Sequence, residues 1–149
     1  MKITLAYICF LIFSPVICAQ ELVDRIIYLD SVFRETNQFN QSYYRVIHDF
    51  YKNRQTYKIT DYYKSGKIYA EGYTTDNRNL VKTGEFVSYF ENGNQKEKIN
   101  YEKSAPIGPY SSWYENGDKE LEGEYLLAEK EGDKNSALRI DQYWDPKNM

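Results

Sequence analysis

From residue 58 to the end, apolar and polar residues alternate in short runs separated by turn-forming residues. Four of these runs align without gaps over ten positions, and each carries two adjacent aromatic rings. They read KITDYYKSGK, EFVSYFENGN, PYSSWYENGD and RIDQYWDPKN. Alternation with a period of two is typical of β-strands, and recurrence of one unit indicates a repeat architecture. The pattern therefore predicts an all-β protein built from repeated elements.

The first three runs end in a turn signal three residues after the second aromatic ring. Asn-Gly is favoured in two-residue type I′ turns, because both central residues of that turn need positive φ. We therefore predict three β-hairpins closed by type I′ turns. The turn residues are Ser65, Gly66, Asn92, Gly93, Asn116 and Gly117.

Each turn is followed by an alternating return strand that ends on a tyrosine, at Tyr73, Tyr101 and Tyr125, and the first of these strands is one residue shorter. A glycine or proline then precedes the next unit. Because a lone hairpin is marginally stable in water, we expect the hairpins to lie edge to edge. The predicted fold is a meander of hairpins that forms one elongated antiparallel sheet.

The fourth run lacks the turn signal. Pro146 and Lys147 stand where the other runs have the turn pair, and proline cannot adopt positive φ. We predict a last strand that caps the array. A repeat truncated in mid-unit would read the same way.

Residues 20–57 lie outside the clear repeat, and their apolar spacing fits two structures. Leu22, Ile26, Leu29 and Phe33 suit one helix face, whereas the same segment also reads as strand, turn, strand. Its β-branched and aromatic residues favour strands. The predicted organisation is a signal peptide at 1–19, lead-in strands at 20–57 and hairpin repeats at 58–149.

The first nineteen residues resemble a secretory signal peptide, with Lys2, an apolar run from Leu5 to Phe13, and Ala19 before the cut. We predict cleavage between Ala19 and Gln20 and export to the periplasm or the exterior. Lipid attachment at Cys18 is the alternative. The apolar run is too short to span a bilayer, so no transmembrane segment is expected in the mature chain.

Composition narrows the class of partner. Without the signal peptide, 18 basic and 22 acidic residues leave a formal charge of about −4, and both cysteines are gone. An acidic balance argues against nucleic-acid binding. A chain without cysteine has no disulfide and depends on its own core, for which 42% hydrophobic residues suffice in one domain of this size.

Strand alternation divides the aromatic pairs between two sheet faces. The face expected to form the core carries Ile59, Tyr63, Phe86, Phe90, Tyr110, Tyr114, Ile140 and Trp144. The other face carries a regularly spaced row, the candidate binding residues, which are Tyr62, Tyr89, Trp113 and Tyr143. Exposed rings in a row suit a sugar or a protein partner. The alternative is that these rings pack on the return strands or the N-terminal segment.

The pattern of two aromatic residues, Asn-Gly, a return strand rich in lysine and glutamate, and a glycine before the next unit resembles the MORN-type repeat in its bacterial variant. It is similar to the YwqK family of toxin–antitoxin-system antitoxins, over residues 59–148 and best over 84–125. The resemblance implies a hairpin array. It implies the antitoxin role less strongly, because fold does not fix function.

No catalytic or metal site is predicted, and no cofactor. His48 is the only histidine, and a mature chain without cysteine has no Cys/His pair. Glu120, Glu122 and Glu124 alternate on one strand, and we interpret them as a solvated charge ladder with nearby lysines. The sequence thus favours a non-enzymatic protein-binding module, for which the resemblance implies an antitoxin- or immunity-like role. An envelope-associated structural protein that binds cell-wall glycan is the alternative.

Overall fold

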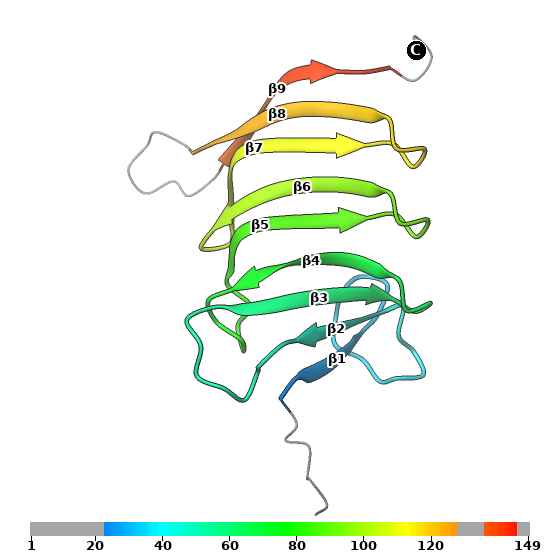
Figure 1. The fold of residues 1–149 in the computed structure, drawn as a ribbon, viewed down its shortest axis with the longest axis vertical. Coiled ribbons are helices and arrows are strands. Elements are labelled where there is room, and N and C mark those ends of the chain that lie inside the picture. Colours follow the sequence, from blue (N-terminus) through cyan, green and yellow to red (C-terminus); the bar gives the residue numbers. More distant parts are fainter. Residues whose placement is uncertain (1–22, 128–135, 146–149) are drawn as a thin grey trace, which may run out of the picture.

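The structure is a computed structural model that describes residues 23–127 and 136–145. These residues form nine strands and no helix, and the strands make one antiparallel sheet in chain order (Figure 1). The predicted all-β meander is therefore confirmed. The predicted signal peptide, its cleavage site and the Pro146-Lys147 pair lie outside the described residues.

The strand bounds place the lead-in segment within the same sheet as the repeats. The strands are β1 (Arg25–Leu29), β2 (Tyr43–Ile47), β3 (Tyr57–Tyr63), β4 (Ile68–Thr74), β5 (Lys82–Tyr89), β6 (Gln95–Glu102), β7 (Ala105–Trp113), β8 (Lys119–Leu127) and β9 (Ser136–Tyr143). β2 pairs with both β1 and β3. The lead-in is thus an integral part of the array.

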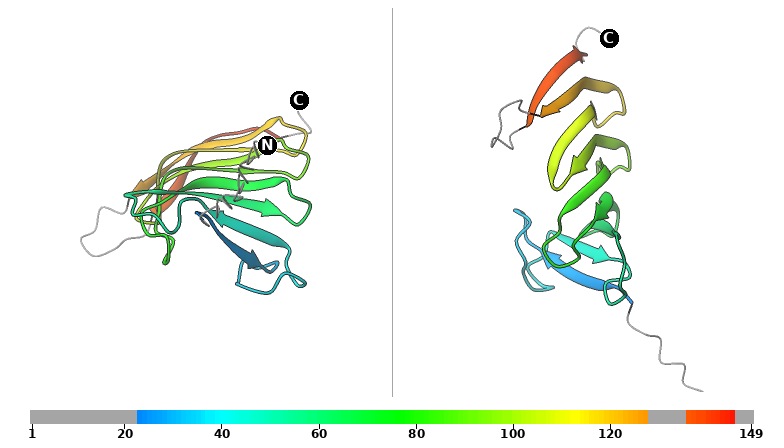
Figure 2. Two further views of the ribbon diagram at one scale, coloured as in Figure 1. Left: turned by 60° about the horizontal axis from the view of Figure 1, so that its bottom comes forward. Right: turned by 90° about the vertical axis from the view of Figure 1, so that its left-hand side faces the viewer.

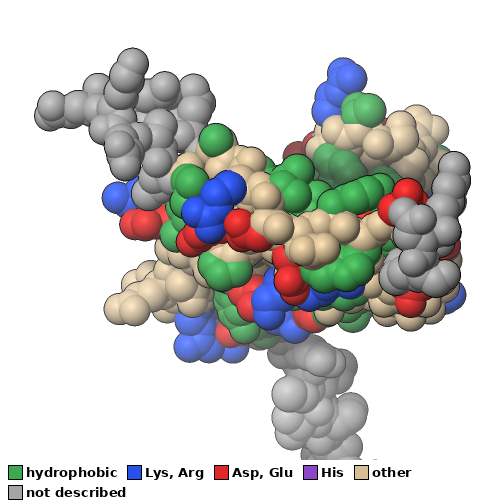
Figure 3. Space-filling view, turned by 90° about the horizontal axis from the view of Figure 1, so that it is seen from above, with side chains coloured by type: hydrophobic (Ala, Val, Ile, Leu, Met, Phe, Trp, Pro, Cys, Tyr) green, Lys and Arg blue, Asp and Glu red, His purple; other side chains and the backbone are tan. Residues whose placement is uncertain are grey.

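The most tightly packed core lies near the N-terminal end of the sheet. Ile47 on β2 is fully buried, at 0% exposure, and it lies opposite Ile59 on β3, which is 3% exposed. Leu29 on β1 is buried as well. At the β9 end, Ile140 is 58% exposed, and Figure 3 shows hydrophobic side chains at the surface there among charged ones. The predicted burial of Ile140 is therefore wrong.

The sheet is a single layer. The strands contact chiefly their immediate neighbours, and the side view in Figure 2 shows them following one another in single file. We name the two faces by one residue each. The Ile59 face carries Ile59, Phe86, Ile99 and Tyr110, and the Tyr62 face carries Tyr62, Glu71, Val87 and Lys98. Most domains cover such a face with a second layer.

The hairpins form at the predicted places, but the predicted turn type is wrong. In the second hairpin the Gly93 N–H donates to Phe90 O (2.9 Å) and the Phe90 N–H donates to Asn94 O (2.8 Å). Only the glycine is left-handed there, with φ of 95°, while Asn92 has no positive φ. This is a type I turn followed by a left-handed glycine in a three-residue loop. The other two hairpins repeat these bonds at Gly66 and Gly117.

The asparagine stabilises the turn through its side chain rather than through positive φ. Asn92 Oδ1 accepts a hydrogen bond from the Asn94 N–H (2.8 Å), and Asn116 Oδ1 accepts one from the Asp118 N–H (3.0 Å). Such a side-chain bond two residues ahead mimics a backbone turn. Asparagine is therefore well suited to this position even with a right-handed backbone.

Neighbouring hairpin tips are tied together by side-chain donors. Lys67 Nζ donates to the backbone oxygen of Glu91 in the next tip (2.7 Å). One repeat further on, Asn92 Nδ2 and Asn94 Nδ2 donate to the backbone oxygen of Glu115 (2.7 and 2.9 Å). The first and second tips thus each satisfy a carbonyl of the tip that follows. These bonds align the repeats along one edge of the array.

The fourth repeat has its register shift at a different position from the second and third repeats. The second and third repeats open on left-handed glycines, Gly84 and Gly108. Leu138 occupies the equivalent position in β9, and the register of β8 with β9 instead shifts around Asp141. A branched residue does not readily take the left-handed backbone, so the irregularity falls later in the strand.

This shift reverses the faces predicted for the last aromatic pair. Tyr143 Oη lies 3.2 Å from the Tyr114 Oη, so Tyr143 belongs to the end of the Ile59 face. Trp144 lies instead near Lys119, whose Nζ is 5.9 Å from the Trp144 ring and 5.4 Å from the Trp113 ring. One extra residue moves every later side chain to the opposite face.

Candidate functional site

Three of the four candidate binding residues lie on the Tyr62 face, and each has a partner within the chain. The Tyr62 ring stacks on Tyr44 with 4.8 Å between ring centres. Tyr89 Oη donates to Glu71 Oε1 (3.1 Å), and Trp113 has the Lys119 ammonium over its ring. Tyr143, the fourth, lies on the other face and is 56% exposed.

The three rings recur at intervals of two strands. Strands in a sheet are about 4.8 Å apart, so Tyr89 and Trp113 are separated by roughly 10 Å across the sheet. Both rings are half-buried, which agrees with the alternative that they pack against neighbouring strands. The hydrogen bond to Glu71 holds Tyr89 in place, and the contact with Lys119 holds Trp113. Both rings remain partly accessible.

Ion pairs also lie on the Tyr62 face. Glu122 pairs with Lys119 and Glu124 pairs with Arg139 at 3.0 Å, in agreement with the predicted charge ladder. Glu120 does not share that face, since its Oε2 accepts a hydrogen bond from Ser112 Oγ (2.9 Å). Among residues 23–127 and 136–145, no cluster of three His, Cys, Asp or Glu side chains could hold a metal ion.

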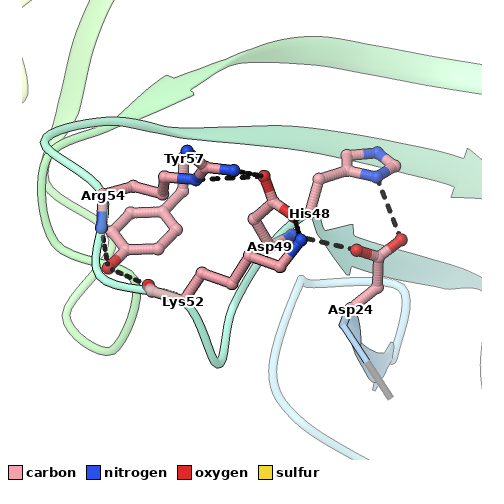
Figure 4. Close-up of polar contacts among 6 residues, drawn as sticks. All are labelled: Asp24, His48, Asp49, Lys52, Arg54 and Tyr57. Atoms are coloured by element: carbon pink, nitrogen blue, oxygen red, sulfur yellow. Dashed lines mark hydrogen bonds and ion pairs between the residues drawn. The ribbon is translucent and has the colours of Figure 1, made fainter. Parts of the chain in front are cut away.

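His48 sits in a chain of polar contacts at the end of β2 (Figure 4). Its Nδ1 is 3.2 Å from Asp24 Oδ2 and its Nε2 is 3.2 Å from Thr60 Oγ1. The order Asp, His, hydroxyl is that of a hydrolase triad. Thr60 is only 2% exposed, so a substrate carbonyl has no access to its hydroxyl, and the contacts serve to attach β1 to the strands beside it.

The loop after His48 is held by the same network. Asp24 Oδ1 accepts from the Asp49 N–H (2.9 Å), and the Asp49 carboxylate binds Arg54 (2.9 Å) and Lys52 (3.2 Å). Lys52 and Arg54 lower the pKa of the Asp49 carboxyl, with Lys52 as the larger cause. These contacts, visible in Figure 4, make residues 48–57 an ordered connection between β2 and β3.

A hollow of about 300 Å³ lies on the Ile59 face over β2 to β6. Its floor is apolar and aromatic, and two connecting segments contribute Phe33 and Leu80 to its lining. Its lining includes four charged residues of this face, which are Arg45, Asp61, Lys82 and Glu97. A fifth, Glu71, belongs to the Tyr62 face, where its carboxylate binds Lys58 and Tyr89. An apolar concavity with a few convergent polar groups is the usual form of a binding site.

Arg45 and Asp61 form a bidentate ion pair in this hollow. Arg45 Nε lies 2.6 Å from Asp61 Oδ1, and Arg45 Nη2 lies 2.7 Å from Asp61 Oδ2. The two residues face each other in the β2–β3 register. The Asp61 side chain is only 8% exposed and that of Arg45 is 17% exposed. Both charges are thus satisfied by each other.

Lys82 enters the hollow from the first residue of β5. Its Nζ lies 5.0 Å from the Phe86 ring centre and 4.7 Å from the Tyr101 ring centre. An ammonium group over an aromatic face is attracted to the ring electrons. Burial lowers the pKa of Lys82, and the nearby Arg45 lowers it further, while Asp61 and Glu97 oppose these effects.

Aromatic pairs repeat along the Ile59 face. Phe86 and Tyr101 meet edge to face at 5.3 Å, and Tyr110 and Tyr125 meet in the same way at 5.6 Å. Tyr110 Oη donates to Glu97 Oε1 (2.9 Å). Edge-to-face pairs add stabilisation beyond simple burial. The hydrophobic layer of the repeats is therefore a stack of these pairs, with one side open to solvent.

Two half-buried tyrosines predict a loss of stability at high pH. Burial, with Tyr43 next in importance, raises the pKa of Tyr63 to about 12, and burial beside Glu97 raises the pKa of Tyr110. An unfolded tyrosine ionises near pH 10, so between about pH 10 and pH 12 the unfolded chain loses protons that the folded chain keeps. The free energy of unfolding should therefore fall as pH rises through this window.

Urea unfolding at a series of pH values measures this effect, and the phenolate absorbance of folded and unfolded chains gives the ionisation directly. Replacing both Tyr63 and Tyr110 by phenylalanine should make the decline shallower. Lys82 has the opposite effect on the free energy of unfolding, and it acts below pH 10.5. Its pKa is lowered in the folded chain, so the folded chain releases this proton while the unfolded chain still holds it, and stability rises with pH there. A stability that is constant or rising above pH 10 would contradict the prediction.

These features define the class of the protein as a single-layer β-hairpin repeat protein with an open aromatic face. Comparison with known proteins found no match to a protein-family model, to a curated protein or to a solved structure. The resemblance to MORN-type repeats therefore rests on the motifs in the sequence. No helix long and apolar enough to cross a membrane occurs in the part of the chain that the structure describes.

Sequence reasoning did not identify the charged residues of the hollow. Arg45 lies in the ambiguous lead-in segment, and Lys82 lies in a connection that reads as a turn. Arg45 follows Tyr43 and Tyr44, whereas Lys82 follows Leu80 and Val81, so no shared local motif marks the two residues. Their meeting depends on the register of β2 with β3 and of β4 with β5.

Proposed function

We propose that this chain is a non-enzymatic, exported interaction module that holds another protein on its Ile59 face. The observation that carries the proposal is that this face, with its aromatic pairs and its hollow, has no second layer over it in the described residues. Apolar surface left open in this way is characteristic of protein-binding sites. An antitoxin- or immunity-like role follows from the resemblance to the YwqK family.

Export shapes how such a role would work. A protein sent out of the cytosol meets its partner in the periplasm or outside the cell, so an immunity function would act on an incoming toxin. The single-layer array supports this role physically, because a rigid row of paired strands offers a large surface at little cost in ordering. The partner would provide the layer that the sheet lacks.

A binding experiment with two matched variants tests this proposal. The purified chain is immobilised, incubated with an envelope extract, and the captured proteins are quantified by mass spectrometry. Ser88→Arg places a long charged side chain in the hollow, whereas Ser111→Arg places the same side chain on the Tyr62 face; both serines are half-buried. We expect Ser88→Arg to reduce capture about ten-fold or more and Ser111→Arg to change it less than about two-fold.

Circular dichroism of both variants shows whether the sheet is intact. Capture that is equal for the two variants, or capture that only Ser111→Arg abolishes, would overturn the assignment to the Ile59 face. The glycan alternative is favoured by the regular spacing of Tyr89 and Trp113. Binding of the chain to purified cell-wall polysaccharide, lost in Trp113→Ala and retained in Ser88→Arg, would establish it instead.

A further inference from the structure

The hollow on the Ile59 face contains a lysine that has no carboxylate partner among the described residues. Lys82 Nζ contacts the rings of Phe86 and Tyr101, and it forms none of the ion pairs present in residues 23–127 and 136–145. Its side chain is partly buried. Aromatic rings only partly replace the water that a buried ammonium group loses.

The two carboxylates of the hollow are engaged elsewhere. Both oxygens of Asp61 are bound by Arg45, and Glu97 Oε1 accepts the hydrogen bond of Tyr110 Oη. Neither carboxylate lies within ion-pair distance of Lys82. Because Asp61 neutralises Arg45, the remaining charges are one positive group at Lys82 and one negative group at Glu97.

We propose that this hollow receives a single carboxylate side chain of the partner protein, an aspartate or a glutamate, which pairs with Lys82 between the rings of Phe86 and Tyr101. The inference rests on the proposed function and adds the chemistry of the partner. Charge-assisted hydrogen bonds between ammonium and carboxylate are among the strongest in proteins. They are strengthened where water is partly excluded, as it is in this hollow.

Size and charge restrict what the hollow accepts. Its volume of about 300 Å³ is at the lower end of ligand sites, which span roughly 300 to 1,000 Å³, and it suits one side chain. Glu97 on the same lining repels a second negative group. The site therefore favours an isolated acidic residue over a run of acidic residues.

The test is an NMR titration of the full chain with N-acetyl-glutamate methylamide, and with the matching glutamine compound as the uncharged control. We expect saturable shifts of the Phe86 and Tyr101 ring signals and of the Lys82 side chain, with binding about ten-fold weaker or more for the glutamine compound. Binding should also raise the pKa of Lys82, because a nearby negative charge favours the ammonium form.

Three variants locate the effect. Lys82→Met removes the charge and should abolish the discrimination between glutamate and glutamine, while Lys82→Arg should restore it. Lys98→Met is the matched control, since Lys98 lies on the Tyr62 face and pairs with Glu85 at 2.6 Å. It should bind as the unaltered chain does. Equal shifts with both compounds, or glutamate binding that persists in Lys82→Met, would overturn the proposal.

A titration with phosphate distinguishes an acidic side chain from other anions. The capture experiment distinguishes failure of this inference from failure of the proposed function. If inorganic phosphate at equal ionic strength binds as tightly as the glutamate compound, the hollow is a general anion site and the assignment to an acidic side chain is wrong. In the capture experiment, loss of the partner in Ser88→Arg but not in Lys82→Met would refute this inference and leave the proposed function standing. Absence of any captured protein would refute the proposed function, while the titration still decides the chemistry of the hollow.

Discussion

Replacing Asp61 with asparagine is expected to lower the free energy of unfolding by about 3–5 kcal/mol, the typical cost of removing one partner from a buried ion pair. Asparagine preserves the shape of the side chain but not its charge. The Arg45 guanidinium, only 17% exposed, would then lose the carboxylate that binds it at 2.6 and 2.7 Å. Urea unfolding followed by circular dichroism measures the change.

A double replacement distinguishes the loss of the pair from the loss of packing. Changing Arg45 to methionine and Asp61 to leucine together removes both charges and keeps most of the volume. Such exchanges are often close to neutral, so the double variant should be more stable than Asp61→Asn. A single variant that loses less than about 1 kcal/mol would show that the pair is far better hydrated than its burial indicates.

Replacing Ile47 with alanine is expected to cost about 2–5 kcal/mol, because the side chain is fully buried and its removal leaves a cavity. Ile140→Ala provides the matched control at the other end of the sheet, where the same residue type is 58% exposed. That replacement should change stability by about 0.5 kcal/mol or less. Both values come from urea unfolding under the same conditions.

The contrast between these two isoleucines tests where the array is anchored. Ile47 belongs to the lead-in segment, and Ile140 belongs to the last strand. If the two variants lost similar stability, the core would be spread evenly along the sheet. The structure instead places the deepest burial around β1 to β4, so the lead-in strands are expected to stabilise the repeats that follow.

An open single-layer sheet connects this stability to the proposed function. Within each aromatic pair of the Ile59 face, the two rings pack edge to face and cover part of each other's surface. The rest of each ring stays accessible. Stabilisation therefore comes from neighbours within the layer, and the outward surface stays available to a partner. The ties between hairpin tips, such as Asn92 to Glu115, keep that surface rigid.

The sequence predicted the hairpins because their signals are local. Gly66, Gly93 and Gly117 adopt the left-handed backbone that only glycine takes without strain, and alternation assigns the strands on either side of them. The turn type was mispredicted for a physical reason. Asn-Gly fits two loops of different length, and the asparagine side chain stabilises the longer one by bonding to Asn94 or Asp118.

From β3 onward, the order of strands and the positions of the hairpin turns are thus determined by the sequence alone, since each depends on residues that are neighbours in the chain. The tertiary structure decided which face each ring occupies in the last repeat, because the shift at Asp141 arises from pairing between β8 and β9. It also decided the candidate site. Arg45, Asp61, Lys82 and Glu97 are far apart in sequence, and only the register of successive strands brings their charges into one hollow.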